Sequence, residues 1–310
     1  MYNPLVSIII PVYCGENFMK KAIDSAINQT YKNIEIIVVN DGSPDNGKTR
    51  EIALSYGDRI KYFEKENGGC ASALNFGIKK MNGEWFSWLS HDDEYDENKV
   101  QKEIEIVNRY NLNKNNTIIS CNAQIIDKDG RTFKHYFVKD CGLYSGKSFF
   151  HRLLFGQALN GCGLLIPKDV FEKIGYFSEK LIFLLDWEYW LRCAINGVEL
   201  YRIGNENLVK NRIHLSQVTV LHKEKNYIEQ KKLINFLSEK LVKENEVSLV
   251  KELAVYSLEK GFEESWIILK KYLKDKNINT EILYLKGIFK SVKSEFLEKL
   301  KNIYWKIRRR

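Results

Sequence analysis

Residues Leu5–Val12 (LVSIIIPV) are almost all aliphatic, and most of them are β-branched. A strand without alternating polar residues is typical of the centre of a parallel sheet, where helices cover both faces. A second aliphatic run follows at Ile34–Val39, and the intervening residues Phe18–Gln29 have the apolar periodicity of a helix. Because parallel strands require a crossover between them, this spacing predicts a β-α-β unit.

The alternation of strands and helices continues along the chain. Further helices are predicted over Lys48–Tyr56 and Ala71–Met81, and further strands over Ile60–Phe63 and from Trp85 onward. This pattern predicts an α/β fold with a Rossmann-like, mostly parallel sheet and flanking helices. The sequence contains neither GxGxxG nor GxxxxGK[ST], which argues against a dinucleotide oxidoreductase and a P-loop enzyme.

Four polar segments come directly after predicted strands or lead into the next helix. In an open α/β sheet, ligands bind beyond the carboxyl ends of the strands. We therefore expect the four segments to converge on one ligand-binding crevice. They are Tyr13–Asn17, Asn40–Asp45, Asn67–Gly69 and Ser90–Glu94.

The last of these segments is unusually acidic. Trp85–Leu89 is predicted to be a buried strand, and Asp92, Asp93 and Glu94 follow it closely. Adjacent carboxylates repel one another, and burial makes that repulsion costly. A divalent cation bound by carboxylate oxygens would compensate, and it would also neutralise the phosphates of a substrate. The alternative is an acidic turn that precedes the next helix and binds no ligand.

Several segments occur together in a characteristic order. The chain carries VSIIIPVY, a helix, NIEIIVVNDGSPD, ENGGCASALNFGI and WLSHDDEY. The series resembles the nucleotide-sugar-binding half of the inverting family-two glycosyltransferases, which have the GT-A fold. The resemblance is strong from residue 5 to about residue 100 and continues more weakly to about residue 222. It implies a GT-A fold and a nucleotide-sugar donor.

The resemblance also implies roles for individual residues of the donor site. Asp41 would accept a hydrogen bond from the nucleotide base, which suits uracil. Asp92 would lie near the ribose, and Asp93 would bind Mn²⁺ or Mg²⁺ bridging the diphosphate, in line with the preference of these ions for carboxylate oxygens. Ser90 and Leu74 depart from the family pattern, which often has Asp and Arg at these positions. The remaining candidate donor contacts are Pro11, Tyr13, Asn67 and Gly68.

A second acidic position, Asp186, is the candidate catalytic residue. An inverting transfer needs one base to deprotonate the acceptor hydroxyl, and in the family this base is the second acid of a pair before a Trp-rich helix. Asp186 occupies that place, whereas Leu185 replaces the first acid. The alternative is that Asp186 only caps a helix over Trp187–Ile195. Glu188 is the substitute candidate for the base.

His214 follows a strand that is predicted over Glu199–Ile203. The resemblance implies that a histidine in this region reaches the metal or the diphosphate through a loop that orders when the donor binds. The alternative is a histidine without a functional role.

The C-terminal part of the chain has a helical pattern throughout. From Ile282 to Arg310, apolar residues recur three to four residues apart, among nine Lys or Arg and two Glu. This combination predicts an interfacial helix on an anionic membrane surface. The alternative is a helix packed on the catalytic domain or on a second subunit of a homo-oligomer. The predicted division is 1–115 for the nucleotide-sugar-binding half, 116–222 for the acceptor-binding and catalytic-base half of the same domain, and 223–310 for a helical extension.

Composition limits the location and the partners. Residues 1–11 lack the features of a signal peptide, and no apolar run is long enough to span a membrane. The six cysteines show no CxxC spacing, which predicts reduced, mostly buried thiols. The net charge of +8 is concentrated in the last helix, which argues against nucleic-acid binding. We therefore expect a cytoplasmic protein, peripheral on the inner face of the cell membrane.

Together these observations predict a metal-dependent inverting glycosyltransferase of the hexosyl- or N-acetylhexosaminyltransferase class. Its donor would be UDP-linked, and its acceptor would be a hydroxyl of a surface glycan or lipid-linked saccharide. One alternative is the same fold with a GDP- or dTDP-sugar. The other is a catalytically inactive nucleotide-sugar-binding or scaffold protein, which the departures at Leu74, Ser90 and Leu185 favour.

Overall fold

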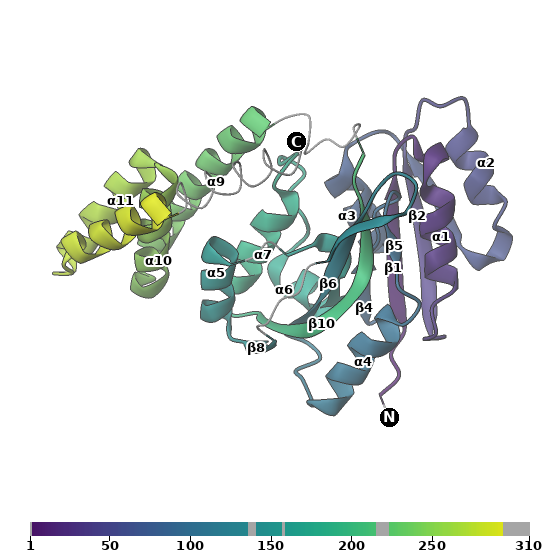
Figure 1. Ribbon diagram of the computed structural model, residues 1–310, viewed down its shortest axis with the longest axis horizontal. Coiled ribbons are helices and arrows are strands. Elements are labelled where there is room, and N and C mark those ends of the chain that lie inside the picture. The colour runs from purple at the N-terminus through teal and green to yellow at the C-terminus, as the bar shows by residue number, and fades with distance from the viewer. Residues whose placement is uncertain (1, 136–140, 157–158, 215–222, 294–310) are drawn as a thin grey trace, which may run out of the picture. The chain divides into compact units, whose positions relative to one another are not determined.

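The chain divides into two compact units. Unit 1 comprises residues 1–149 and 157–223, and unit 2 comprises residues 150–156 and 224–310. The boundary after residue 223 lies beside the predicted start of the helical extension, but the sequence did not predict that residues 150–156 group with that extension. The computed structural model describes residues 2–135, 141–156, 159–214 and 223–293 (Figure 1).

The first half of the sheet in unit 1 is parallel, as the sequence predicts. β1 (Val6–Val12) lies between β2 (Ile34–Asp41) and β4 (Trp85–Trp88), and β3 (Lys61–Lys65) pairs with the other side of β2. Every residue of β1 is buried, which is why its sequence lacks the alternation of a half-exposed strand.

Helices cover both faces of β1. α1 (Met19–Ile27) buries its apolar side in the same core as Ile8 and the other even-numbered residues of the strand. α3 (Cys70–Lys80) covers the opposite face, where a Cβ on Gly77 would come within 2.5 Å of a methyl group of Ile9. The absence of a side chain at Gly77 therefore allows α3 to approach the sheet closely.

The second half of the sheet is mixed. β9 (Leu164–Pro167) runs antiparallel to β4 and to β6 (Thr117–Ile126), whereas β10 (Glu199–Arg212) runs parallel to β6. β5 (Glu94–Tyr95) pairs antiparallel with β10 and ends the sheet, whose order in the described residues is β3-β2-β1-β4-β9-β6-β10-β5. Two short strands complete it, β7 (Thr132–His135) beside β6 and β8 (Gly142–Tyr144) beside β10.

β10 is much longer than the strand that was predicted over Glu199–Ile203. It continues to Arg212, with register shifts against β6 between Arg202 and Val209. Residues 204–207 (GNEN) obscure this continuation, because a strand is recognised from its apolar residues. The extension matters for the site, since it carries the chain to the acidic turn after β4.

Helices of unit 1 complete the fold. α7 (Leu185–Ile195) begins two residues before its predicted start, with Leu184 at the N-cap position. The alternative that Asp186 caps this helix is therefore wrong, because Asp186 lies inside the first turn. α6 (Lys168–Ile174) is followed by Gly175 at the C-cap position, where φ is 87°. The other helical elements that lie wholly or partly in unit 1 are η1 (Gly15–Asn17), α2 (Lys48–Leu54), η2 (Gly57–Arg59), α4 (Lys99–Arg109), α5 (Gly146–Phe155) and η3 (Gly161–Gly163).

The six cysteines are free thiols, and only half of them are buried. Cys121, Cys162 and Cys193 are buried, whereas the other three are exposed. The expectation of mostly buried thiols is therefore met at three positions and wrong at Cys14, Cys70 and Cys141.

Unit 2 consists of helices in its described residues. α9 (Lys223–Lys243), α10 (Val247–Lys260) and α11 (Glu263–Asp275) are followed by a helix over residues 280–293. This last helix packs closely on α10, because a Cβ on Gly287 would lie 2.4 Å from the Cβ of Leu258. Within the described part of the chain, we find no helix both long and apolar enough to cross a membrane. The helical pattern predicted over 294–310 lies outside the described residues.

Candidate active site

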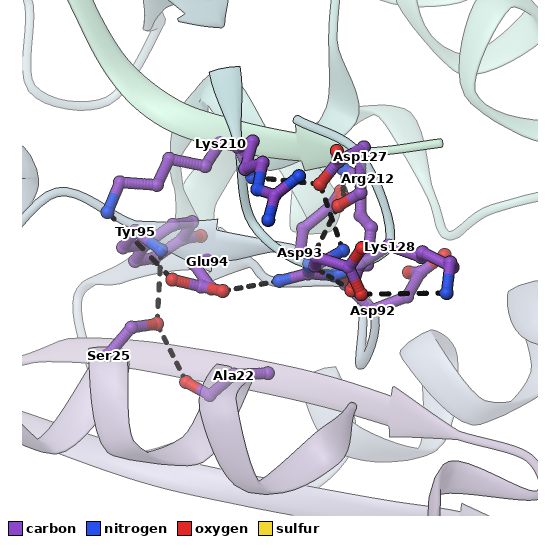
Figure 2. A network of polar contacts seen from close by, with 12 residues as sticks. Ala22, Ser25, Asp92, Asp93, Glu94, Tyr95, Asp127, Lys128, Lys210 and Arg212 are labelled. Carbon is purple, nitrogen blue, oxygen red and sulfur yellow. Dashed lines mark hydrogen bonds and ion pairs between the residues drawn. The ribbon is translucent and has the colours of Figure 1, made fainter. Parts of the chain in front are cut away.

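The acidic turn after β4 is closed by the side chain of Tyr95. The Tyr95 hydroxyl donates to the carbonyl oxygen of Trp88 at 2.6 Å, and it shares a hydrogen bond of 2.8 Å with Ser87 Oγ. On the far side, the Tyr95 backbone N–H donates to Ser25 Oγ at 3.0 Å. Figure 2 shows this link to α1 beside the turn. Tyr95 thus joins both ends of the turn that carries the candidate acids.

A buried ion pair lies behind this closure. Lys99 Nζ donates to Ser87 Oγ at 3.1 Å and to a carboxylate oxygen of Glu103 at 2.9 Å, and both charged side chains are 0% exposed. The ammonium group also lies 4.4 Å from the ring centroid of Tyr95. Burial raises the pKa of Glu103 to about 7, although the charge of Lys99 opposes the shift. The sequence offered no signal for this pair beyond its i,i+4 spacing.

Asp93 is buried and fully engaged with the protein. Its Oδ1 accepts the backbone N–H of Arg212 at 2.9 Å, and its Oδ2 accepts Asn211 Nδ2 at 2.7 Å and the thiol of Cys162 at 3.3 Å. Burial raises the pKa of Asp93 to about 7, with the neighbouring charge of Asp92 as the next cause. The carboxylate therefore joins the acidic turn to β10 and to η3.

Arg212 is the centre of a polar network that the sequence did not predict (Figure 2). Its buried guanidinium donates from Nε to the carbonyl oxygen of Asp92 at 2.9 Å, and it pairs through Nη2 with the carboxylate of Glu94. Nη1 donates to the carbonyl oxygens of Asp127 and Lys128, at 2.9 and 3.1 Å. A single arginine in a polar stretch carries no periodic signal, so only the fold identifies this role.

Asp92 and His214 lie next to each other, as expected for two members of one site. His214 Nε2 is 3.0 Å from Asp92 Oδ2, and both side chains are half-buried. The imidazole also stacks at a tilt on Phe18, with 5.2 Å between the ring centroids. His91, the other histidine of this region, hydrogen-bonds to the backbone of Pro11, and burial lowers its pKa. The structure thus pairs His214 with Asp92 and keeps Asp93 in the buried network.

Asp41 holds the loop before α3. Its carboxylate accepts hydrogen bonds from Lys65 Nζ at 2.7 Å and from the backbone N–H groups of Gly68 and Gly69 at 3.0 and 2.7 Å. The close approach of the two segments requires a glycine after Asp41, since Gly42 has φ +66° and a Cβ there would lie 2.7 Å from the next loop. The predicted residues Asp41 and Gly68 are therefore in direct contact.

Cys70, the first residue of α3, is influenced by the charges of several candidate acids. Solvent reaches this side chain, yet its pKa is raised to about 12, first by burial and then by the charges of Asp186, Asp41 and Asp92. The charges of acids from three separate segments therefore all act on the Cys70 thiol. Hydrogen bonds between the polar loops agree with their expected convergence, since the backbone N–H of Cys14 donates to Ser43 Oγ at 2.9 Å and that of Gly68 donates to Asp41 Oδ1 at 3.0 Å. Cys70 was not among the predicted site residues.

Asp186 has the properties of a proton acceptor. Its Oδ1 accepts the backbone N–H of Trp187 at 2.6 Å, and burial raises its pKa to about 6 despite that bond. A carboxyl pKa closer to neutrality suits general-base catalysis. Glu188, the substitute candidate, is already engaged, because its Oε1 accepts Arg192 Nε at 2.8 Å.

The described residues of the site provide a partial set of metal ligands. Among the residues that the structure describes, no group of three or more His, Cys, Asp or Glu side chains is arranged to hold one. Asp92 and His214 offer one carboxylate and one imidazole. Mg²⁺ in phosphate-binding sites commonly takes only one or two protein carboxylates and completes its shell with substrate phosphates and water. The donor set fits a cation that arrives with a phosphate-bearing substrate.

Comparison with known proteins identifies related sequences. Residues 7–173 match the family model for glycosyl transferase family 2. An uncharacterized glycosyltransferase of Rickettsia typhi is 51% identical over 220 residues, which cover 70% of this chain and 67% of that protein. Glycosyltransferase GlyA of Streptococcus pneumoniae serotype 4 is 29% identical over 237 residues, 66% of this chain and 31% of that protein. Some relatives are longer, and the chain spans 35% of a Rickettsia felis glycosyltransferase.

A solved structure shows the same fold. The crystal structure of S. aureus TarS 1–349 in complex with UDP-GlcNAc has a TM-score of 0.65 over 91% of this chain and 79% of that chain, at 15% identity. Similarity at that identity concerns the fold alone. The family model, by contrast, covers more than half of the chain. The match to the Rickettsia typhi relative covers two thirds of that relative's own length. The chain therefore belongs to glycosyl transferase family 2, and it is a glycosyltransferase with the GT-A fold.

Proposed function

We propose that this chain transfers a sugar from a UDP-linked donor to a hydroxyl of a surface glycan or lipid-linked saccharide, with inversion at the anomeric carbon. The observation that carries the proposal is the hydrogen bonding between the loops at the carboxyl ends of the strands, where Asp41 accepts the backbone N–H of Gly68 at 3.0 Å and Asp92 lies 3.0 Å from His214. These loops lie where ligands bind in open α/β sheets. The UDP-GlcNAc in the TarS complex supports UDP among the nucleotides.

We propose that the nucleotide base of the donor binds at the carboxyl ends of β1 and β2. A carboxylate offers about four acceptor positions, and Lys65, Gly68 and Gly69 occupy three of those on Asp41. The fourth would accept the ring N–H of uracil. The other donor contacts in this proposal are Pro11, Tyr13, Asn67 and Gly68, of which Tyr13 and Asn67 are exposed to an incoming ligand.

We assign Asp92 and His214 to Mn²⁺ or Mg²⁺. Asp93, the ligand predicted from the sequence, is less suitable, because it would have to give up its hydrogen bonds to Arg212 and Asn211. When bound, the cation would neutralise charge that builds on the departing diphosphate. Asp93 would instead act by holding the turn that carries Asp92.

Asp186 would act as the general base. The acceptor hydroxyl oxygen attacks the anomeric carbon from the face opposite the diphosphate. As the new C–O bond forms, the bond to the diphosphate breaks and the hydroxyl proton passes to the Asp186 carboxylate. Trp187 would keep this carboxylate oriented through its backbone N–H.

Two other functions are retained as alternatives. One is the same transfer with a GDP- or dTDP-sugar. The other is a nucleotide-sugar-binding scaffold without activity, which is favoured by the departures from the family pattern. Leu74 and Leu185 are both buried side chains, so these positions contribute to packing and not to ligand contacts.

We further propose a cytoplasmic location, peripheral on the inner face of the cell membrane, with residues 282–310 as the contact. In the described part of that segment, Ile282, Leu285 and Phe289 are exposed. A homo-oligomer stays a prediction of the sequence.

Calorimetric titration of the purified chain with UDP, GDP and dTDP, each with Mn²⁺ and with EDTA, tests the donor proposal. We expect UDP to bind in the presence of Mn²⁺ and GDP and dTDP to bind much more weakly. Release of UDP from UDP-GlcNAc and other UDP-sugars then tests for transfer. Folded protein that binds none of the three nucleotides would contradict the proposal and favour the inactive scaffold.

A further inference from the structure

The helix over residues 280–293 carries two adjacent stripes on its surface. Lys286, Lys290 and Lys293 are spaced so that they share one side of the helix. Beside them runs an apolar stripe that is open to solvent within the described residues. It consists of Ile282, Leu285, Phe289 and Val292, which are 54%, 67%, 70% and 62% exposed.

α10 fixes the orientation of this helix. The close contact at Gly287 with Leu258 places the opposite side of the helix against α10. Lys290, next to that contact, lies with its ammonium 3.3 Å from the ring centroid of Phe155. The lysine stripe therefore lies between the contact with α10 and the apolar stripe. Adjoining basic and apolar faces of this kind are typical of helices that lie in a membrane interface.

A cavity of about 680 Å³ lies along the lysine stripe. Its volume is within the range of small-ligand sites. Lys251 of α10 faces Lys286 and Lys290 around it, and the only carboxylate in its lining is Glu252, whose Oε2 lies 2.8 Å from His151 Nδ1. In the described part of the chain, no carboxylate lies within ion-pair distance of these three ammonium groups. The apolar lining includes Val255, Ile282, Leu283, Leu285 and Phe289.

We propose that this cavity binds the phosphate headgroup of an anionic phospholipid, while the apolar stripe enters the acyl-chain region of the membrane. The inference rests on the proposed membrane contact of residues 282–310 and narrows it to a defined site. Three ammonium groups around one cavity complement a phosphate, and the adjoining apolar residues lie where the acyl chains would continue.

The surroundings of Lys290 support this assignment. Burial lowers its pKa, Glu259 and Glu252 oppose the shift, and Lys286 adds to it. Glu259 and Glu252 also have partners of their own, Glu259 in Lys260 and Glu252 in His151. A phosphate oxygen would stabilise the charged form of a lysine that is partly removed from water.

Vesicle co-sedimentation of the full chain tests the proposal. We expect binding to phosphatidylcholine vesicles that contain phosphatidylglycerol, weak binding without it, and a decline as salt rises. The variant Lys286→Gln/Lys290→Gln should bind about thirtyfold more weakly, since each lysine near an anionic surface contributes about fivefold to the affinity. The matched control Lys271→Gln/Lys274→Gln removes the same charge from exposed positions of α11 outside the cavity, and it should change binding by about twofold or less.

The outcomes separate the site from the broader membrane contact. Equal weakening by both lysine pairs would overturn the cavity as a site and leave a diffuse attraction to the membrane. Failure of the unmodified chain to bind phosphatidylglycerol vesicles would overturn both. A change in oligomeric state of Leu285→Ser/Phe289→Ser in sedimentation equilibrium, without any vesicle binding by the unmodified chain, would assign the stripe to a second copy. Unchanged circular dichroism and unchanged UDP affinity would show that each variant is folded.

Discussion

The backbone N–H of Arg212 donates to Asp93 Oδ1 at 2.9 Å, although 119 residues separate the two in the chain. The guanidinium of the same arginine donates to the carbonyl oxygen of Asp92. One residue of β10 therefore holds both neighbouring acids. Because His214 follows two residues later, it lies within reach of Asp92. The two acids thus differ in what they contact, Asp93 inside the protein and Asp92 beside the histidine.

Asp92→Asn tests the assignment of the cation. The substitution keeps the shape of the side chain but removes its charge, and Mn²⁺ and Mg²⁺ prefer charged carboxylate oxygens as ligands. We expect the Mn²⁺-dependent affinity for UDP to fall about tenfold or more, measured by calorimetry with Mn²⁺ and with EDTA. Asp58→Asn, at an exposed position of η2, is the matched control. Equal UDP affinity in Asp92→Asn and the unmodified chain would remove Asp92 from the metal site.

Asp93→Asn should act on stability instead. An amide nitrogen in place of one carboxylate oxygen would face the donors from Arg212 or Asn211, which leaves buried donors unsatisfied. We expect the free energy of unfolding to fall by about 1–3 kcal/mol, measured by urea denaturation, while the response of UDP binding to Mn²⁺ is retained. Loss of the Mn²⁺ response in a variant of normal stability would restore the role that the sequence predicted for Asp93.

Asp186→Asn should separate catalysis from donor binding. Removing a general base typically lowers turnover by about 10²-fold or more, whereas UDP affinity should not change. Steady-state release of UDP from the donor sugar measures turnover. Glu188→Gln is the comparison, because it perturbs the same helix through Arg192 and should affect stability more than turnover. Near-normal turnover of Asp186→Asn would assign the base to another residue.

The pH dependence of turnover should report Asp186. The pKa of this acid is raised from 3.8 to about 6 by burial, and only its ionised form accepts a proton. At saturating substrate, the rate should fall about tenfold for each pH unit below the pKa and level off above it. Because the folded pKa exceeds the unfolded one, the stability from this group is present below pH 3.8 and is lost as the pH rises through about 6. Asp186→Asn should therefore unfold at a higher temperature than the unmodified chain at pH 7. If the turnover of Asp186→Asn still fell at acidic pH in the same way, a group other than Asp186 would cause the pH dependence of the rate.

The buried pair Lys99–Glu103 should be far more sensitive to single than to paired substitution. Lys99→Met or Glu103→Leu alone leaves one charge buried without its partner, at a cost of about 3–5 kcal/mol. Lys99→Met/Glu103→Leu removes both charges and should cost less than either single change. Urea denaturation of the three variants gives the comparison. A double variant that loses the sum of both single effects would show that the pair is not coupled.

Much of the fold follows from patterns within short segments. The strands at Val6–Val12 and Ile34–Asp41, and their parallel order, follow from largely apolar runs and from the helix between them. Each of these signals is local, because a strand that is buried on both faces has apolar residues at consecutive positions. The family resemblance of these segments also identified Asp92, Asp186 and His214 as candidates.

The sequence by itself determined the α/β class, the family and the set of candidate acids. Only the tertiary structure decided which of Asp92 and Asp93 lies beside His214, and which is held by Arg212. It also decided that β10 continues through polar residues to the acidic turn, and that Lys99 and Glu103 pair beneath it. The physical reason is distance along the chain. Hydrogen bonds between segments more than a hundred residues apart depend on how the sheet brings them together, and adjacent aspartates have the same chemistry until their surroundings differ.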